Sequence, residues 1–149
     1  MDVNQFIIRI IAATTCGLLI GLERQWHRKK AGIRTNSLVA LGSAVFVVLS
    51  FKLISIYGGD VTRIIGQVVT GVGFLCAGVI MQQGLNVMGL TTSATIWCSS
   101  AVGCMAGAGY YLEAFFCTLL IMFINGVLKN TDRWINRKLK DGSGEDEDY

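Results

Sequence analysis

The chain has 149 residues, of which 52% are hydrophobic and only 15% are charged, with 18 glycines, no proline and a formal net charge of +3. Soluble domains carry about 25% charged residues, and here the charges sit in blocks between long uncharged runs. This pattern excludes an ordinary soluble domain and predicts an all-α membrane protein with several crossings. The basic residues fall where cytoplasmic loops would carry them, so they indicate topology, and we expect no nucleic-acid partner.

The cysteines and the histidine argue against a metal site and a catalytic site. All five cysteines lie inside apolar runs, none forms a CxxC pair, and His27 is the one histidine. We therefore expect no metal, no cofactor and no enzyme activity, because neither a zinc site nor a Ser–His–Asp grouping is feasible. The N-terminal MDVNQ lacks the positive flank of a cleavable signal, so the first apolar run should remain as a membrane span.

The first predicted span covers about Gln5 to Leu22 and contains Arg9. Arg9 either extends to the headgroups or meets a partner inside the bundle, since a charge at the bilayer centre is costly. The loop from Glu23 to Arg34 follows, and it holds five of the thirteen Lys and Arg residues. Thr35, Asn36 and Ser37 are expected to cap a second span that runs to about Ile56.

The third predicted span, Ile64 to Met81, is short and rich in small residues. Asp60 is expected to cap its start. A helix that faces only lipid needs no such set of small residues, so we expect close contact with neighbouring helices or with a pathway. The predicted packing positions in this span are Gly66, Gly71, Gly73, Ala77 and Gly78.

An uncharged connection from Gln82 to Leu90 leads to a fourth predicted span, Thr91 to Ala108. Thr91 and Thr92 are expected to act as helix caps at its start. Ser99, Gly103 and Gly107 recur every four residues, which places small residues on one helix face and permits close helix contact, within the chain or across a dimer.

The fifth predicted span ends near Leu128, and the segment from Lys129 to Lys140 carries five more Lys and Arg residues. This segment could form a short helix on the inner leaflet, and the acidic end of the chain is expected to be disordered. We therefore divide the chain into a transmembrane domain, 1–128, and a cytoplasmic tail, 129–149. The charge distribution predicts five transmembrane helices with the N-terminus outside and the C-terminus inside.

Polar side chains form two candidate clusters once the spans are arranged in this way. An outer cluster would contain the possible ion pairs Arg9–Glu113 and Asp60–Arg63, unless these residues only cap a helix or reach the headgroups. In the inner cluster, Glu23 could pair with Arg24 or with Arg34, or it could form only a surface salt bridge that adds little stability. The outer cluster comprises Arg9, Asp60, Arg63, Gln67 and Glu113, and the inner one Glu23, Arg24, Arg34, Asn36, Gln82 and Gln83.

Four segments in order resemble the MgtC/SapB family of bacterial inner-membrane proteins. They are GLERQ from Gly21, AGIRTNSLVALGSA from Ala31, GGDVTRIIGQVVTGVGFLCAGVI from Gly58 and GLTTSATIW from Gly89. The resemblance extends over roughly Phe6 to Gly109. Longer members of the family have a soluble C-terminal domain, so this chain resembles the short form.

The resemblance implies a five-span protein of the bacterial inner membrane, linked to growth at low magnesium and to survival inside host macrophages. One branch of the family restrains the F-type ATP synthase through membrane contacts. We therefore expect a regulatory protein that acts by helix contacts with another membrane complex and that forms a homo-oligomer, most simply a dimer. The alternative is a small oligomeric ion transporter or channel with a pathway lined by the third and fourth spans.

Overall fold

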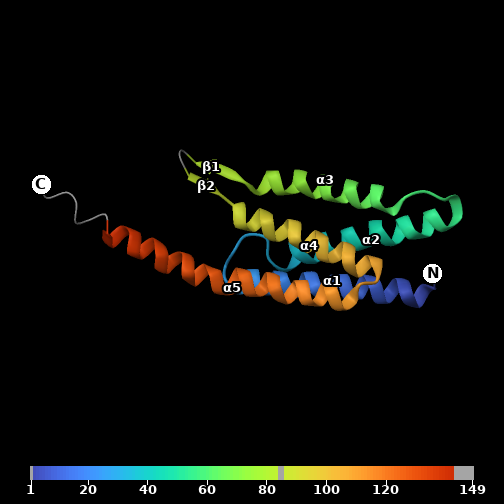
Figure 1. Ribbon diagram of the computed structural model, residues 1–149, viewed down its shortest axis with the longest axis horizontal. Helices are drawn as coiled ribbons and strands as arrows, with labels where there is room; N and C mark the ends of the chain where they lie inside the picture. The colour runs from blue at the N-terminus through green and yellow to red at the C-terminus, as the bar shows by residue number, and fades with distance from the viewer. Residues whose placement is uncertain (1, 84–85, 143–149) are drawn as a thin grey trace, which may run out of the picture.

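The computed structural model describes residues 2–83 and 86–142, and the environment of the side chains of residues 2–82 and 86–128. Five helices and one antiparallel hairpin make up this part of the chain, and the helices lie side by side along its long axis (Figure 1). The elements are α1 (Val3–Trp26), α2 (Ile33–Tyr57), α3 (Val61–Val79), β1 (Met81–Gln83), β2 (Asn86–Met88), α4 (Leu90–Ala108) and α5 (Tyr111–Gly142). The expected disordered tail lies outside the described residues from 143 onward.

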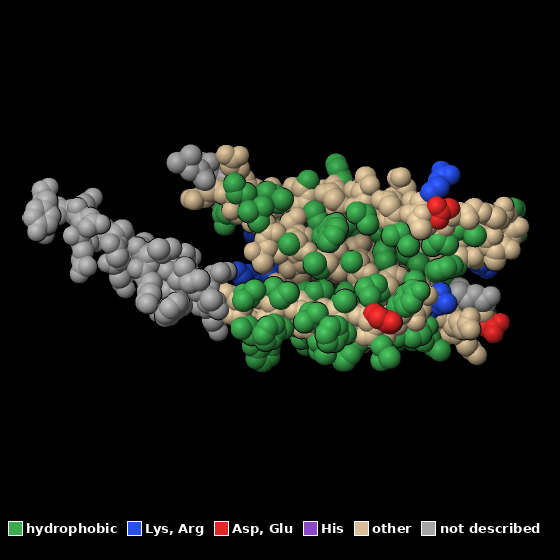
Figure 2. Space-filling model, in the orientation of Figure 1, with side chains coloured by type: hydrophobic (Ala, Val, Ile, Leu, Met, Phe, Trp, Pro, Cys, Tyr) green, Lys and Arg blue, Asp and Glu red, His purple; other side chains and the backbone are tan. Residues whose placement is uncertain are grey.

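Four of these helices are long and apolar enough to cross a membrane: α1, α2, α3 and the Tyr111–Leu128 part of α5. The chain is therefore a multi-pass membrane protein. Hydrophobic side chains cover the visible face of the bundle, and acidic and basic ones lie mainly toward its two ends (Figure 2). The fourth predicted span, α4, has 19 residues but is not among these four helices, because its many Ser and Thr residues lower its hydropathy.

Helix α4 occupies the centre of the bundle and packs against each of the other four helices. Most of its inward-facing side chains are small or hydroxylic, with Ile96 as a larger exception, and Ser99, Ala106 and Ile96 are fully buried. Protein surrounds these hydroxyl groups, so they need not face lipid, where a polar group is costly. Helix α3 instead lies at the edge, against α2 and α4 (Figure 1).

Close helix contacts within the bundle depend on glycines of α1 and α4. A Cβ on Gly17 of α1 would lie 2.6 Å from the carbonyl oxygen of Asn36, and one on Gly107 would lie 2.8 Å from the Cα of Ala44. A Cβ on Gly103 would overlap the carbonyl oxygen of Ala40. These glycines let the α1 and α4 backbones approach α2, in the manner of small-xxx-small contacts in membranes. The predicted packing role of Gly103 and Gly107 therefore has a physical basis within one chain.

Of the three predicted helix caps, only the one at the start of α3 is observed. Asp60 caps α3, since its carboxylate accepts hydrogen bonds from the N–H of Thr62 at 2.8 Å and from the Thr62 hydroxyl at 2.7 Å. Helices α2 and α4 instead begin after glycines and have no side-chain cap. The expected caps Thr91 and Thr92 lie inside the first turn of α4, and the expected caps at 35–37 lie inside α2, so these predictions are wrong.

Two further elements were not expected. The uncharged connection between α3 and α4 contains the hairpin, in which Met81 pairs with Met88 and Gln82 with Val87. Helix α5 continues past Leu128 to Gly142 without a break, so the basic segment is the last part of α5 and not a short helix of its own. Figure 1 shows this end of α5 extending beyond the other helices, at the same end as the hairpin.

Candidate functional site

Asn36 lies at the centre of a buried polar seam between α2 and α4. Its Nδ2 donates to the carbonyl oxygens of Ala31 at 2.7 Å and Gly32 at 3.0 Å, and its Oδ1 accepts from the Ser99 hydroxyl at 2.8 Å. Asn36 and Ser99 are both fully buried. The side chain thus ties the start of α2 to the middle of α4, which explains a polar residue at this depth.

Arg24 continues the seam toward α1 and is only 2% exposed. Its Nη2 donates to the Thr92 hydroxyl at 2.7 Å and to the carbonyl oxygen of Lys30 at 3.5 Å. Oε1 of Glu23, next to it in the chain, lies 2.9 Å from Nδ1 of His27, and the two form an ion pair when the ring is protonated. No ion pair within 4.0 Å joins Glu23 to an arginine among the described side chains, so the predicted pairing is wrong. His27, directly after the end of α1, lies closer.

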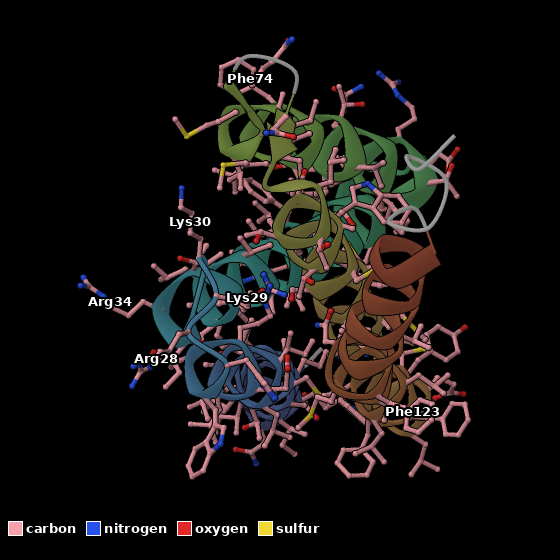
Figure 3. The ribbon with its side chains drawn as sticks, turned by 90° about the vertical axis from the view of Figure 1, so that its left-hand side faces the viewer. Arg28, Lys29, Lys30, Arg34, Phe74 and Phe123 are labelled. Carbon is pink, nitrogen blue, oxygen red and sulfur yellow. The ribbon has the colours of Figure 1, made fainter. Side chains whose placement is uncertain are left out.

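The end of the bundle near this seam is basic. Arg28, Lys29, Lys30 and Arg34 are exposed there, and Figure 3 views the bundle from this end with all four labelled. Arg34 therefore lies at the surface, whereas Arg24 and Asn36 lie inside, so the predicted inner cluster is divided between a solvated face and a buried seam. The four exposed cations form the largest group of like charges among the described side chains.

Arg9 binds the C-terminal end of α4 from α1. Its Nη1 donates to the carbonyl oxygen of Gly107 at 2.9 Å, and its guanidinium carbon lies 5.6 Å from the ring centroid of Phe51. A cation is favourable at the negative end of a helix dipole. Glu113 is exposed on α5 and forms no ion pair within 4.0 Å among the described side chains, so the predicted Arg9–Glu113 pair is wrong.

Asp60, Arg63 and Gln67 lie together at the opposite end from the basic residues, and all three are exposed. Hydrogen bonds from the Thr62 hydroxyl and N–H, together with the charge of Arg63, hold the pKa of Asp60 below its ordinary value. Asp60 and Arg63 do not form an ion pair within 4.0 Å in the part of the chain that is described. The two charges therefore stay available to other groups.

The small residues of α3 have open space beside them. A Cβ added to Gly66, Gly71, Gly73 or Gly78 would meet no atom within 4 Å, and Ala77 is exposed. The expected close contact of these small residues with neighbouring helices is therefore not met within the single chain, where only Val68 and Cys76 of α3 are buried, and the alternative, a pathway beside α3, stays a prediction. Contact with a second copy or another protein stays a prediction.

Four of the open positions form one stripe. Gly66, Thr70, Gly73 and Ala77 are all exposed and are spaced by four, three and four residues, which places them on a single face of α3. We call this face the small-residue stripe. Thr70 was not among the predicted packing positions, although its spacing to the glycines places it on their face. Gly17 and Gly21 were not predicted either, and their four-residue spacing marks the tight contact between α1 and α2.

Two grooves flank α3. One, of about 470 Å³, lies between α2 and α3, and the other, of about 340 Å³, lies between α3 and α4. Ser43 lines the first and Ser100 the second, and their hydroxyl oxygens are 2.7 Å apart, so this pair separates the two grooves. The remaining walls are mainly apolar. Among the described side chains of residues 2–82 and 86–128, no three His, Cys, Asp or Glu residues come together as a metal site.

Comparisons with known proteins agree with these features. The family model described as "MgtC family" matches residues 10–134. The chain is 44% identical over 140 residues to Protein MgtC of Salmonella choleraesuis, covering 94% of this chain and 59% of the relative. It is 48% identical over 122 residues to Protein MgtC of Brucella abortus, covering 80% of this chain and 50% of that protein.

A third relative, the uncharacterized protein slr0014 of Synechocystis, is 41% identical over 138 residues, covering 93% of this chain and 58% of the relative. The chain thus spans between 50% and 59% of the length of these three relatives. No solved structure matches. The family match covers most of the chain, including α2, α3, α4 and the polar seam. This chain therefore belongs to the MgtC family.

Proposed function

We propose that this protein is an inner-membrane regulatory protein that acts through helix contacts with another membrane complex. The small-residue stripe on α3 carries this proposal. In a bilayer, helices associate by close van der Waals packing and not by burial of apolar surface, so small residues mark the faces where backbones approach. The glycines of α1 and α4 already contact α2, whereas the stripe is open to a partner.

The biological setting of the proposal comes from the family. The resemblance to MgtC/SapB proteins supports a role in adaptation to low magnesium and in survival inside host cells, and it makes the F-type ATP synthase the first complex to test. A second copy of the chain is another partner that the stripe can accept, and we propose a dimer as the simplest oligomer. We propose no catalytic step.

Replacing Gly73 with leucine should remove the partner while leaving the monomer folded, because the added side chain fills the space in which another helix would pack. Crosslinking in cell membranes should show the partner band reduced about ten-fold, and growth at low magnesium should be impaired to match. Gly126→Leu on α5 is the matched control, since a Cβ there also meets no atom within 4 Å. Unchanged crosslinking and growth in Gly73→Leu would contradict the proposal.

Ion transport is the alternative, and the grooves beside α3 give it less support. An ion pathway needs polar groups to replace water around the ion, but the walls of both grooves are mainly apolar. Flux measurements on purified protein in liposomes separate the two functions. Flux that changes in Asp60→Asn or Arg9→Ala would favour transport, and no flux together with loss of the partner in Gly73→Leu would favour regulation.

We also propose that all five helices cross the membrane, with the N-terminus outside and the C-terminus inside. The exposed cations at 28–30 and 34 support this orientation, because positively charged loops stay in the cytoplasm. Reporter fusions provide the measurement: a fusion after Lys30 should report the cytoplasm and one after Gly59 the outside. The reverse pattern, or the same side for both, would overturn the topology.

A further inference from the structure

The groove between α2 and α3 is continuous with a pocket at its open end. The pocket, of about 330 Å³, contains Asp60 and Arg63, and the groove, of about 470 Å³, extends from it along the two helices. Ile64 and Gln67 line both. The two spaces therefore adjoin along α3. Together they form one surface groove with a charged mouth and a deeper apolar part.

The polar groups of this feature are ordered by depth along α3. Asp60 precedes the helix, Arg63 lies in its first turn, and Gln67 lies one turn deeper on the same side, since residues four apart are neighbours on a helix. The mouth thus presents a carboxylate and a guanidinium that do not bond each other, followed by an amide. No charged residue lines the deeper part of the groove.

The deeper part is apolar and narrow. Val68, Val72 and Phe46 line it, and Gly71 leaves its wall open because a Cβ there would meet no atom within 4 Å. The α2 wall runs from Leu38 to Phe46, about 12 Å at 1.5 Å per residue. A single acyl chain is apolar and thinner than a helix, whose diameter is about 10 Å, and it suits the apolar lining of this part.

We propose that this groove binds one phospholipid with a zwitterionic ethanolamine head group. The ammonium of the lipid pairs with Asp60, its phosphate pairs with Arg63, and the amide of Gln67 donates to an ester carbonyl oxygen. One acyl chain then lies in the groove against Val68 and Gly71. A mouth with one charge of each sign matches a head group that also carries one of each.

The chemistry of the mouth separates ethanolamine from related head groups. A primary ammonium donates hydrogen bonds to a carboxylate, whereas a choline head group has no N–H to donate. A glycerol head group offers the same phosphate to Arg63 but only neutral hydroxyl donors to Asp60, which bind a carboxylate more weakly than an ammonium does. The Asp60 carboxylate can accept further bonds, because each carboxylate oxygen has more than one lone-pair site and each takes one bond from Thr62.

Native mass spectrometry of the full chain, with phospholipids of matched acyl chains, tests the proposal. We expect about five-fold more retained ethanolamine lipid than choline or glycerol lipid, the size of effect that exposed charge pairs give. Asp60→Asn should abolish the preference over choline and still cap α3, because asparagine is a good cap. Arg63→Gln should weaken all three lipids about five-fold, and Gly71→Leu should do the same by filling the tail groove.

Glu113→Gln and Gly126→Leu are the controls, since both residues lie on α5 outside the groove, and neither should alter retention. A photo-reactive benzoylphenylalanine in place of Phe46, which lines only the groove, should label lipid in membranes. Equal retention of the three lipids, or no effect of Arg63→Gln, would overturn the proposal. Labelling of a second copy of the chain in place of lipid would overturn it as well.

Discussion

Gly103→Ala should destabilise the protein by about 2–3 kcal/mol, although alanine is the better helix former. The added Cβ would overlap the backbone carbonyl of Ala40 in α2 and come within 2.7 Å of its Cα. Backbone atoms inside a packed bundle cannot move aside as a flexible side chain can, so the helices must separate. Thermal unfolding in detergent micelles, followed by circular dichroism, gives the measurement.

Gly126→Ala is the matched control and should change stability in the opposite direction. A Cβ at Gly126 meets no atom within 4 Å, so the substitution brings only the helix propensity of alanine, which is worth up to about 1 kcal/mol over glycine. The two variants make the same chemical change in two helices. If both raised stability, the contact between α2 and α4 would not be tight at Gly103.

Asn36→Leu should cost about 3 kcal/mol of stability. It removes the hydrogen bonds that the side chain makes with the carbonyl oxygens of Ala31 and Gly32 and with the Ser99 hydroxyl. The Gly32 carbonyl still accepts from the Asn36 N–H, but the partly buried Ala31 carbonyl and the buried Ser99 hydroxyl lose a partner. Each buried group left unpaired costs about 1–3 kcal/mol. The free energy of unfolding of the purified protein in a denaturing detergent series provides the test.

A double variant shows whether this cost comes from the seam itself. In Asn36→Leu with Ser99→Ala, the hydroxyl that lost its partner is also removed, so the double variant should be more stable than the sum of the single effects predicts. The difference should be about 1 kcal/mol, as found for contacting residues. Strict additivity would mean that the bond between Asn36 and Ser99 contributes nothing.

The helical membrane fold could be predicted from the sequence because hydropathy acts locally. Long apolar runs identify spans wherever they occur in the chain, so α1, α2, α3 and the first part of α5 were expected within a few residues of their observed ends. The cap at Asp60 was also predictable, since an acidic residue before an apolar run is a local signal.

Partners across the bundle could not be predicted in the same way. Arg9 and Gly107 are 98 residues apart, and the atom that Arg9 binds is a backbone carbonyl, which every residue has. Glu113 was the predicted partner of Arg9 because a sequence shows the charges of side chains but not which backbone carbonyl lies nearby. The same limit applies to Arg24, whose partner is the Thr92 hydroxyl and not the neighbouring carboxylate.

The number of glycines in a span did not identify the helix whose glycines pack closely within the chain. Glycine is frequent in membrane helices, and its number in a span does not say whether the neighbour belongs to the same chain. Helix α3 has more glycines than α1, yet the glycines of α1 contact α2 and those of α3 face open space. The hairpin was missed because two strands of three residues leave almost no periodic pattern.

The central position of α4 has a consequence for how the chain is made. Helices leave the ribosome in order, so α1, α2 and α3 are synthesised before the hydroxyl-rich α4. A segment of such modest hydropathy partitions weakly into lipid on its own, but the earlier helices already offer the Arg24 guanidinium and the Asn36 amide to receive its hydroxyl groups. If α4 crosses the bilayer as proposed above, its entry and its docking should therefore occur as one event, and assembly of the bundle should depend on this helix.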